Sequence, residues 1–139
     1  MKVHITTKNE KSIENYTRVE IDDGLHTVST LSDNECEFIL ANGVLDLIPT
    51  NSIQAFLMLL RKKLRLGGTI IVGGTDIRMF AKAVINSIIG ETEASDLVSS
   101  RASMVHMSYV ANILTNLGLL IQTSSINGIN YEIKCVRQD

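Results

Sequence analysis

The amino-acid sequence predicts an α/β fold, with a mostly parallel β-sheet, helices on both faces of that sheet and a C-terminal antiparallel β-hairpin. Short apolar segments alternate along the chain with segments whose apolar residues recur every three or four positions. This alternation is typical of parallel strands joined by right-handed helical crossovers. Near the C-terminus, Asn127-Gly128 lies between two segments of strand character. Because both residues tolerate positive φ, this dipeptide predicts a tight hairpin.

The first half of the chain contributes three expected strands and the most regular expected helix. The strands are short apolar runs at residues 3–5, 16–21 and 37–41. Polar residues 49–52 then offer side chains that cap a helix. Beyond them, apolar residues recur on one face of a 3.6-residue period, at Ile53, Phe56, Leu57, Leu60 and Leu64. Gly67-Gly68 is expected to end this helix.

The second half is expected to hold further helices and the remaining strands. Residues 69–72 are apolar throughout, as expected of a central strand that is buried on both faces. Gly73-Gly74 predicts a turn, and Thr75 or Asp76 is expected to cap the helix that follows. Residues 91–103 are polar and less regular, which favours a loop or short helix over the edge of the domain. The last segments are a helix near 108–117 and hairpin strands at 119–123 and 130–137.

Length and composition describe an ordinary globular protein with one domain, residues 1–139. A nucleic-acid-binding module usually shows a basic face and aromatic residues for stacking. Here the formal net charge is −2 and 4% of residues are aromatic, so DNA and RNA are disfavoured as partners. The start of the chain has no signal-peptide pattern and no segment resembles a membrane span, which predicts a cytoplasmic protein. Cys36 and Cys135 lack metal-ligand spacing and are expected to be free and buried.

Several motifs, in the same order and at similar spacing, resemble those of class I S-adenosyl-L-methionine (SAM) methyltransferases. Residues 33–39 (DNECEFI) resemble the family's entry to its fourth strand, and residues 42–49 (NGVLDLIP) resemble the segment that follows. Residues 64–72 (LRLGGTIIV) are similar to its turn into the fifth strand, and residues 106–118 resemble its last helix. The start of the chain, residues 1–20, also resembles short members of the family.

The resemblance implies a truncated class I methyltransferase fold of the Rossmann-like type, with SAM or a related nucleoside as the small-molecule partner. In this family a glycine turn after the first strand lets the backbone approach the methionine part of SAM. Thr6, Thr7 and Lys8 stand there instead, and their side chains are expected to narrow that approach. The acid of the second strand, which receives the ribose hydroxyls, is retained as Glu20. No acid stands at residues 26–29, near the family's adenine acceptor.

Each candidate site residue also has a purely structural interpretation, and the sequence leaves both open. Glu20 is either the ribose acceptor or a solvated acid at a turn. Asn42 and Gly43, which follow the third expected strand, either line the cofactor site or form a tight loop. His106 is the candidate for a catalytic base, because histidine titrates near neutrality and this one matches a family position. Its structural interpretation is packing at a helix start. No residues show the spacing of a metal site.

Three functions fit these residues. The first is a SAM-dependent methyltransferase that transfers a methyl group to an unknown acceptor. The second is a catalytically inactive methyltransferase-like protein that acts as a structural, scaffold or regulatory subunit, which the lost glycines favour. The third keeps the fold but binds another nucleotide. Because a fold does not fix a function, enzymatic activity is left open. A homo-oligomer or a partner protein is also expected, since the missing helix after the first strand leaves part of a sheet face uncovered.

Overall fold

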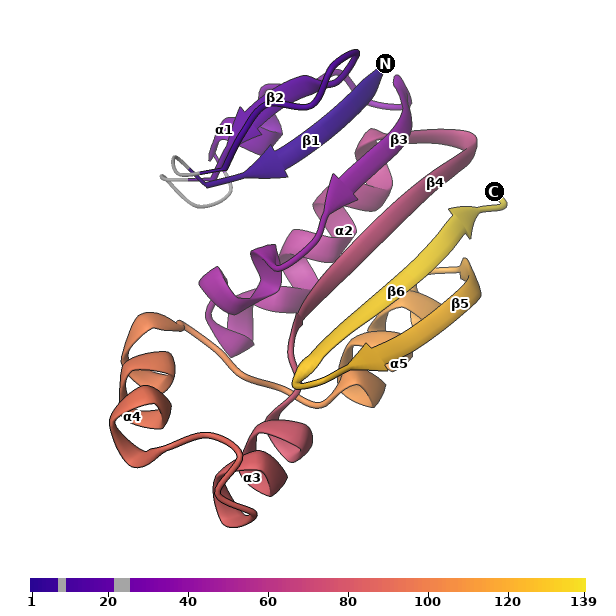
Figure 1. Ribbon diagram of the computed structural model, residues 1–139. Helices are drawn as coiled ribbons and strands as arrows, with labels where there is room; N and C mark the ends of the chain where they lie inside the picture. The colour runs from indigo at the N-terminus through magenta and orange to yellow at the C-terminus, as the bar shows by residue number, and fades with distance from the viewer. Residues whose placement is uncertain (8–9, 22–25) are drawn as a thin grey trace.

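The computed structural model describes residues 1–7, 10–21 and 26–139 and contains one six-stranded β-sheet (Figure 1). The strands lie in the order β2-β1-β3-β4-β6-β5 across the sheet. Their bounds are β1 Lys2–Thr6, β2 Thr17–Glu20, β3 Cys36–Ala41, β4 Leu64–Thr75, β5 Leu119–Asn127 and β6 Asn130–Arg137. The α-helices are α1 His26–Ser29, α2 Ile53–Lys63, α3 Ile77–Ile85, α4 Glu91–Ser100 and α5 Met107–Asn116. Two 3-10 helices, η1 Val44–Leu47 and η2 Thr50–Ser52, lie between β3 and α2.

The sheet combines a parallel part with an antiparallel end. β1 pairs in parallel with β2 on one side and with β3 on the other, and β3 pairs in parallel with β4. β6 then pairs antiparallel with both β4 and β5. The turn between β5 and β6 contains Gly128 at φ 63°, the left-handed conformation that Asn-Gly hairpins use. This arrangement confirms the mostly parallel Rossmann-like sheet and its C-terminal antiparallel hairpin.

One face of the sheet carries the hydrophobic core and three helices. α1, α2 and α5 lie on this face, and α2 contacts both of the others (Figure 1). Ile39 of β3, Ile70 of β4 and Cys135 of β6 are neighbours in this layer and are buried. Helix α2 adds its apolar side chains to the same layer, at Ile53, Phe56, Leu57 and Leu60. Each such side chain contributes about 1.5–3 kcal/mol on burial, so this layer supplies the main hydrophobic stabilisation.

The opposite face of the central strands is only half covered. Phe38 and Leu40 of β3 and Ile71 of β4 lie on it and are half-buried. Tyr16, just before β2, sets its ring edge-on against Phe38 with 6.1 Å between the ring centres. Among the described residues, α1, α2 and α5 are the helices that pack on the sheet, and they lie on one face, whereas the sequence predicts helices on both faces. The physical reason is that the connection from β1 to β2 forms no helix in its described residues.

Two glycine pairs differ from their sequence prediction, because both lie inside β4. The sequence predicts that Gly67-Gly68 ends α2, but β4 begins directly after that helix. Gly67 has φ 76° and lies where the register between β3 and β4 shifts, between the pairs Cys36–Leu64 and Phe38–Thr69. Gly73-Gly74 is not a turn but the buried last part of the strand. Glycine is required there because neighbouring groups approach the backbone closely.

Replacing Gly73 with alanine is expected to lower the free energy of unfolding by about 1–3 kcal/mol, the usual cost of overpacking. The new Cβ would collide with the side chain of Asn42 and with the backbone carbonyl of Tyr131. Gly90→Ala is the control, because no heavy atom lies within 4 Å of the Cβ position there. Urea unfolding measures both variants. Equal losses in the two would contradict the close approach of β3 and β6 to this glycine.

Candidate functional site

A polar hollow of about 420 Å³ lies at the carboxyl edge of the parallel strands. The chain leaves β1 toward β2 on one side of the sheet and leaves β3 toward β4 on the other. Such a switch point opens a crevice beyond the carboxyl ends of neighbouring strands, where ligands of open α/β sheets bind. The hollow is lined by Glu10, Asn42, Gly43, Asp46, Gly74, Arg101 and Asn130. Two of the residues singled out by the sequence, Asn42 and Gly43, therefore lie in its wall.

Asn42 and Gly43 follow β3 directly and leave the backbone accessible from the hollow. The Nδ2 of Asn42 donates to Oε2 of Glu132 at 3.3 Å, and the N–H of Gly43 donates to the carbonyl of Gly73 at 3.1 Å. Gly43 has φ 78°, and no heavy atom lies within 4 Å of its Cβ position. A ligand can therefore approach this stretch of main chain closely.

Asp46 of η1 is a buried carboxylate in the wall of the hollow, with an exposed fraction of 8%. Its Oδ1 accepts a hydrogen bond from the N–H of Thr75 at 2.7 Å, and its Oδ2 accepts one from the Thr75 hydroxyl at 2.8 Å. The Nε of Arg101 lies 3.5 Å from Oδ2. A buried carboxylate is costly unless its oxygens are paired. These contacts satisfy Asp46 and connect η1 to the end of β4.

Asp76 follows β4 and is fully buried. Its Oδ1 accepts hydrogen bonds from the N–H groups of Arg78 and Met79, which caps α3. Its Oδ2 accepts from the N–H of Met107 at 2.8 Å and contacts Nδ1 of His106 at 2.7 Å. Burial alone would raise the pKa of Asp76, but the hydrogen bonds from Met107, Met79 and His106 outweigh it and lower the pKa below its ordinary value. One carboxylate thus holds the start of both α3 and α5.

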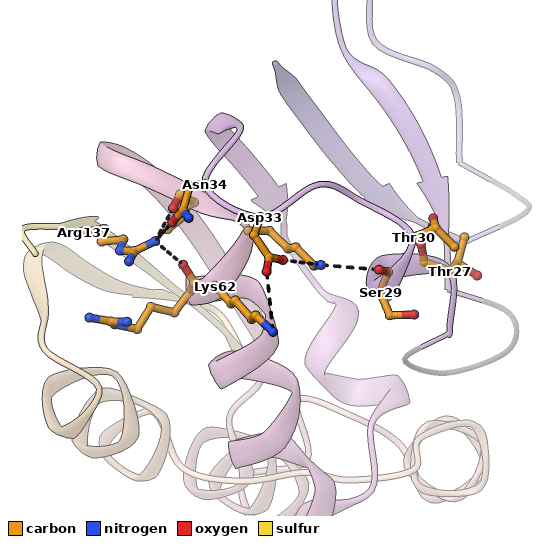
Figure 2. Close-up of polar contacts among 10 residues, drawn as sticks. Thr27, Ser29, Thr30, Asp33, Asn34, Lys62 and Arg137 are labelled. Carbon is orange, nitrogen blue, oxygen red and sulfur yellow. Dashed lines mark hydrogen bonds and ion pairs between the residues drawn. The ribbon is translucent and has the colours of Figure 1, made fainter.

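A second hollow, of about 480 Å³, lies near the C-terminal end of α2. Figure 2 shows the polar contacts of residues in its lining, among them Asp33, Asn34 and Arg137. Several polar side chains of this hollow form hydrogen bonds and ion pairs with other residues of the chain. Arg137 donates to Oδ1 of Asn34 at 2.6 Å, and the ammonium of Lys63 donates to Oδ1 of Asp33 at 2.7 Å. The hydrogen bond from Lys63 lowers the pKa of Asp33 below its ordinary value. This cluster joins the entry to β3 to α2 and the C-terminal strand, and the smaller hollow at the switch point is the better candidate site.

No family model and no curated protein matches the sequence, but solved structures match the fold. An O-methyltransferase family protein from Burkholderia thailandensis superposes with a TM-score of 0.62 at 10% identity, covering 88% of this chain and 36% of that one. The magnesium protoporphyrin IX methyltransferase of Synechocystis PCC 6803, solved with bound SAH, gives 0.60 at 15% identity, covering 88% and 52%. A SAM-dependent methyltransferase from Archaeoglobus fulgidus gives 0.61 at 13% identity, covering 88% and 68%. The chain has the fold of a class I SAM-dependent methyltransferase.

At the end of β1 lie the residues whose sequence departs from the family's glycine turn. Thr6 is fully buried there, and its hydroxyl donates to the carbonyl of Thr7 at 3.2 Å. Thr7 is half-buried, and Lys8 lies outside the described residues. A buried side chain thus stands where the family resemblance places the first glycine. The accessible backbone lies instead on the β3 side of the switch point, at Gly43.

Glu20, the predicted ribose acceptor, ends β2 but does not line the hollow. Its Oε1 lies 3.3 Å from Nη2 of Arg18, and its side chain is 41% exposed. His106 also lies outside the wall of the hollow. Its side chain is 26% exposed and its Nδ1 faces Asp76. The structure therefore places Asn42 and Gly43 in the wall of the hollow, and it places Glu20 and His106 outside that wall, each with its own partner.

Sequence reasoning missed four residues that line the hollow: Glu10, Asp46, Arg101 and Asn130. Asp46 stands in the segment that resembles a family motif, which is the one signal that pointed to it. Arg101 lies in residues 91–103, a segment that the sequence places over the edge of the domain, although most of that segment is helix α4. Glu10 and Asn130 carry no sequence pattern that distinguishes them from other polar residues.

The described residues contain no group of three or more His, Cys, Asp or Glu side chains that could hold a metal ion. None of the described helices combines the length and the apolar character that a bilayer crossing requires. Cys36 and Cys135 are free and buried, as the sequence predicts. Burial raises the pKa of the Cys135 thiol to about 12, which keeps it protonated and unreactive.

Replacing Asp76 with alanine is expected to lower the free energy of unfolding by about 2–4 kcal/mol, because α3 loses its cap and buried N–H groups lose their acceptor. Glu14→Ala is the control, since that acid is exposed. Chemical unfolding near neutral pH measures both variants. A loss for Asp76→Ala no larger than that for Glu14→Ala would contradict the role of this carboxylate in both helix starts.

The lowered pKa of Asp76 also predicts a dependence of stability on pH. In the unfolded chain this carboxylate takes up its proton near the ordinary pKa of 3.8, whereas in the folded chain it does so only at lower pH. The stabilisation that ionised Asp76 gives the fold is therefore fully present above pH 3.8. It is lost as the pH falls through the lower folded pKa. Asp76→Asn, which does not titrate, is expected to lose less stability on acidification than the unmodified protein. Parallel acid profiles for the two proteins, measured by denaturant unfolding, would argue against this assignment.

Proposed function

We propose that this domain binds SAM in the hollow at the switch point and transfers its methyl group to an acceptor whose identity is open. The observation that carries the proposal is the position of the hollow. It lies beyond the carboxyl ends of β3 and β4 of a methyltransferase fold, with Glu10 of the β1–β2 connection in its lining, and Asn42 and Gly43 form part of its wall. Solved structures that share this fold include methyltransferases with bound SAH.

The groups that line the hollow suit the chemistry of SAM. Glu10 and Asp46 are carboxylates that favour cationic groups, and SAM carries an ammonium and a sulfonium. Arg101 offers a cation for the carboxylate of SAM, and Asn42 offers an amide for hydroxyl or amine groups. The accessible backbone at Gly43 offers, on the β3 side, the close approach that the family's glycine offers after β1, where a threonine is buried in this chain. Bound there, SAM would supply an activated methyl group, and the protein's part is position and charge.

Glu20 ends β2 outside the hollow, so its proposed role as acceptor for the ribose hydroxyls requires SAM to extend from the hollow past the end of β1. Its ion pair with Arg18 does not prevent this role. An ion pair with a side chain that is 41% exposed contributes at most about 1 kcal/mol, so hydrogen bonds to a ribose can replace it. The carboxylate then accepts from two hydroxyls instead of from one guanidinium.

His106 is proposed as the group that receives a proton from the methyl acceptor. Asp76 holds its Nδ1, so Nε2 is the nitrogen left for the acceptor. The lone pair of an acceptor hydroxyl or amine forms the new bond to the methyl carbon, and the electrons of the broken carbon–sulfur bond stay on sulfur. The proton released by the acceptor goes to Nε2 of His106.

A second function, a catalytically inactive scaffold or regulatory subunit, is favoured by one specific observation. Thr6 is fully buried at the end of β1, where the family resemblance places glycine. The chain also spans between 36% and 68% of the length of the three solved methyltransferases compared with it. Under this proposal the sheet and its core are retained for assembly, and the hollow binds no SAM.

Thermal unfolding with and without SAM or SAH distinguishes the two functions. Ligand at about 100 times its Kd adds roughly 2.7 kcal/mol of stability, which is a rise in Tm of about 10 °C for a domain of this size. Glu20→Ala and Asn42→Ala are each expected to abolish most of this rise. Glu37→Ala is the matched control, because that acid pairs with Arg65 near the start of β3.

Two results would contradict the proposal in different ways. No rise in Tm at millimolar SAM and SAH would remove cofactor binding and leave the scaffold function. A full rise in Glu20→Ala would show that the ribose acceptor is another residue, while SAM binding itself would stand.

A further inference from the structure

Helices α3 and α4, with the turn between them, present large apolar side chains to solvent. Ile85 is 80% exposed and Ile88 is 76% exposed, and Val98 and Ile77 are 56% and 45% exposed. These residues are close in sequence and lie on one helical unit that extends beyond the carboxyl edge of the sheet (Figure 1). We call them the α3–α4 apolar surface. Clustered exposed apolar side chains on a soluble protein mark an interaction site.

The rest of the chain buries few side chains of α3 and α4, so these helices gain little packing stabilisation from it. Helix α4 has ten residues and buries none of its side chains. Helix α3 buries only Phe80 and Ala83, which form a small cluster with Ile89, separate from the main core. Most helical stability in proteins comes from packing an apolar face. A further surface that covers these helices would supply the packing that the chain itself does not.

Apolar hollows lie beside the exposed isoleucines. One of about 300 Å³ lies between α3 and α4, and its apolar lining consists of Ile77, Phe80, Val98 and Met104. Another, of about 220 Å³, is lined by Ile88 and the neighbouring apolar residues Met79, Ala83 and Ile129. Protruding apolar side chains and apolar hollows therefore lie on the same helical unit. A surface that carries both can pair with itself about a two-fold axis.

The charges of the two helices decide which partner fits. Exposed Arg78 and Lys82 are the charged side chains of α3, whereas exposed Glu91, Glu93 and Asp96 are those of α4. Within the described residues, no salt bridge engages these five side chains. A two-fold rotation that lays α3 of one copy on α4 of another brings opposite charges together. An anionic lipid surface would repel the three acids of α4.

We propose that a second copy of this chain docks on the α3–α4 apolar surface, with α3 of each copy against α4 of the other. Ile85 and Ile88 of each copy enter the apolar hollow between the helices of its partner. The flanking cations of α3 meet the acids of α4, which sets the register and the antiparallel sense of the pair. This inference does not depend on SAM binding.

Sedimentation equilibrium at micromolar concentrations tests the pairing. The unmodified protein is expected to be a dimer, and Ile85→Asp with Ile88→Asp is expected to weaken dimerisation at least about 30-fold, as loss of an interface hot spot does. Both side chains are more than three-quarters exposed, so circular dichroism and Tm of the monomeric variant are expected to show an intact fold. Leu66→Asp is the matched control, because Leu66 is 64% exposed in β4, away from α3 and α4.

Charge reversal then tests the register of the pair. Arg78→Glu with Lys82→Glu makes both helices acidic, and Glu91→Lys with Glu93→Lys makes α4 basic. Each variant alone is expected to be monomeric, whereas an equimolar mixture of the two is expected to form heterodimers.

Three results would overturn the proposal. They are a monomeric unmodified protein, a dimer that survives aspartate at both isoleucines, and a mixture of charge variants that stays monomeric. The second result would assign dimerisation to another surface, such as the half-covered sheet face. A monomer that sediments with anionic vesicles would assign the apolar surface to a membrane instead.

Discussion

Two buried carboxylates, Asp46 and Asp76, hold the carboxyl edge of this domain together. A carboxylate removed from water is costly unless hydrogen bonds replace the lost hydration. Asp46 receives both the N–H and the hydroxyl of Thr75, and Asp76 receives N–H groups at the starts of α3 and α5. The end of β4 thereby fixes η1, α3 and α5 at once. In the wall of the hollow at the switch point, Asp46 of η1 contacts both the end of β4, at Thr75, and Arg101.

One face of the sheet is covered by helices and the other is only half covered, and this asymmetry affects the candidate site. The connection after β1 forms no helix in its described residues, and Thr6 packs inward where the family resemblance places glycine. Tyr16 covers Phe38 on the face that lacks helices. A ligand at the switch point therefore finds accessible main chain on the β3 side, at Gly43, rather than beyond β1.

Sequence patterns predicted the parts of the fold that depend on residues close together in the chain. The apolar periodicity of residues 53–64 predicted helix α2, and Asn127-Gly128 predicted the hairpin of β5 and β6. The cap of α3 by Asp76 was also within reach, because its N–H partners lie two and three residues ahead. Its bond to Met107 joins residues 31 positions apart, and the bonds of Asp46 to Thr75 span 29. No periodicity or motif in the sequence predicts contacts between residues this far apart. For the same reason the sequence did not show that Gly73-Gly74 is buried inside a strand, and the pair was predicted to be a turn.

Arg101 links the two surfaces on which the proposals rest. Its side chain lines the polar hollow at the switch point and also the apolar hollow between α3 and α4. Its Nε lies near both Asp46 and Thr75, at 3.5 Å from the carboxylate Oδ2. A partner seated on α3 and α4 would thus contact the residue that offers a cation to a ligand carboxylate. If both proposals hold, a shift of Arg101 on binding of one partner would alter its contact with the other, and the affinity for ligand and the affinity between copies would be linked reciprocally.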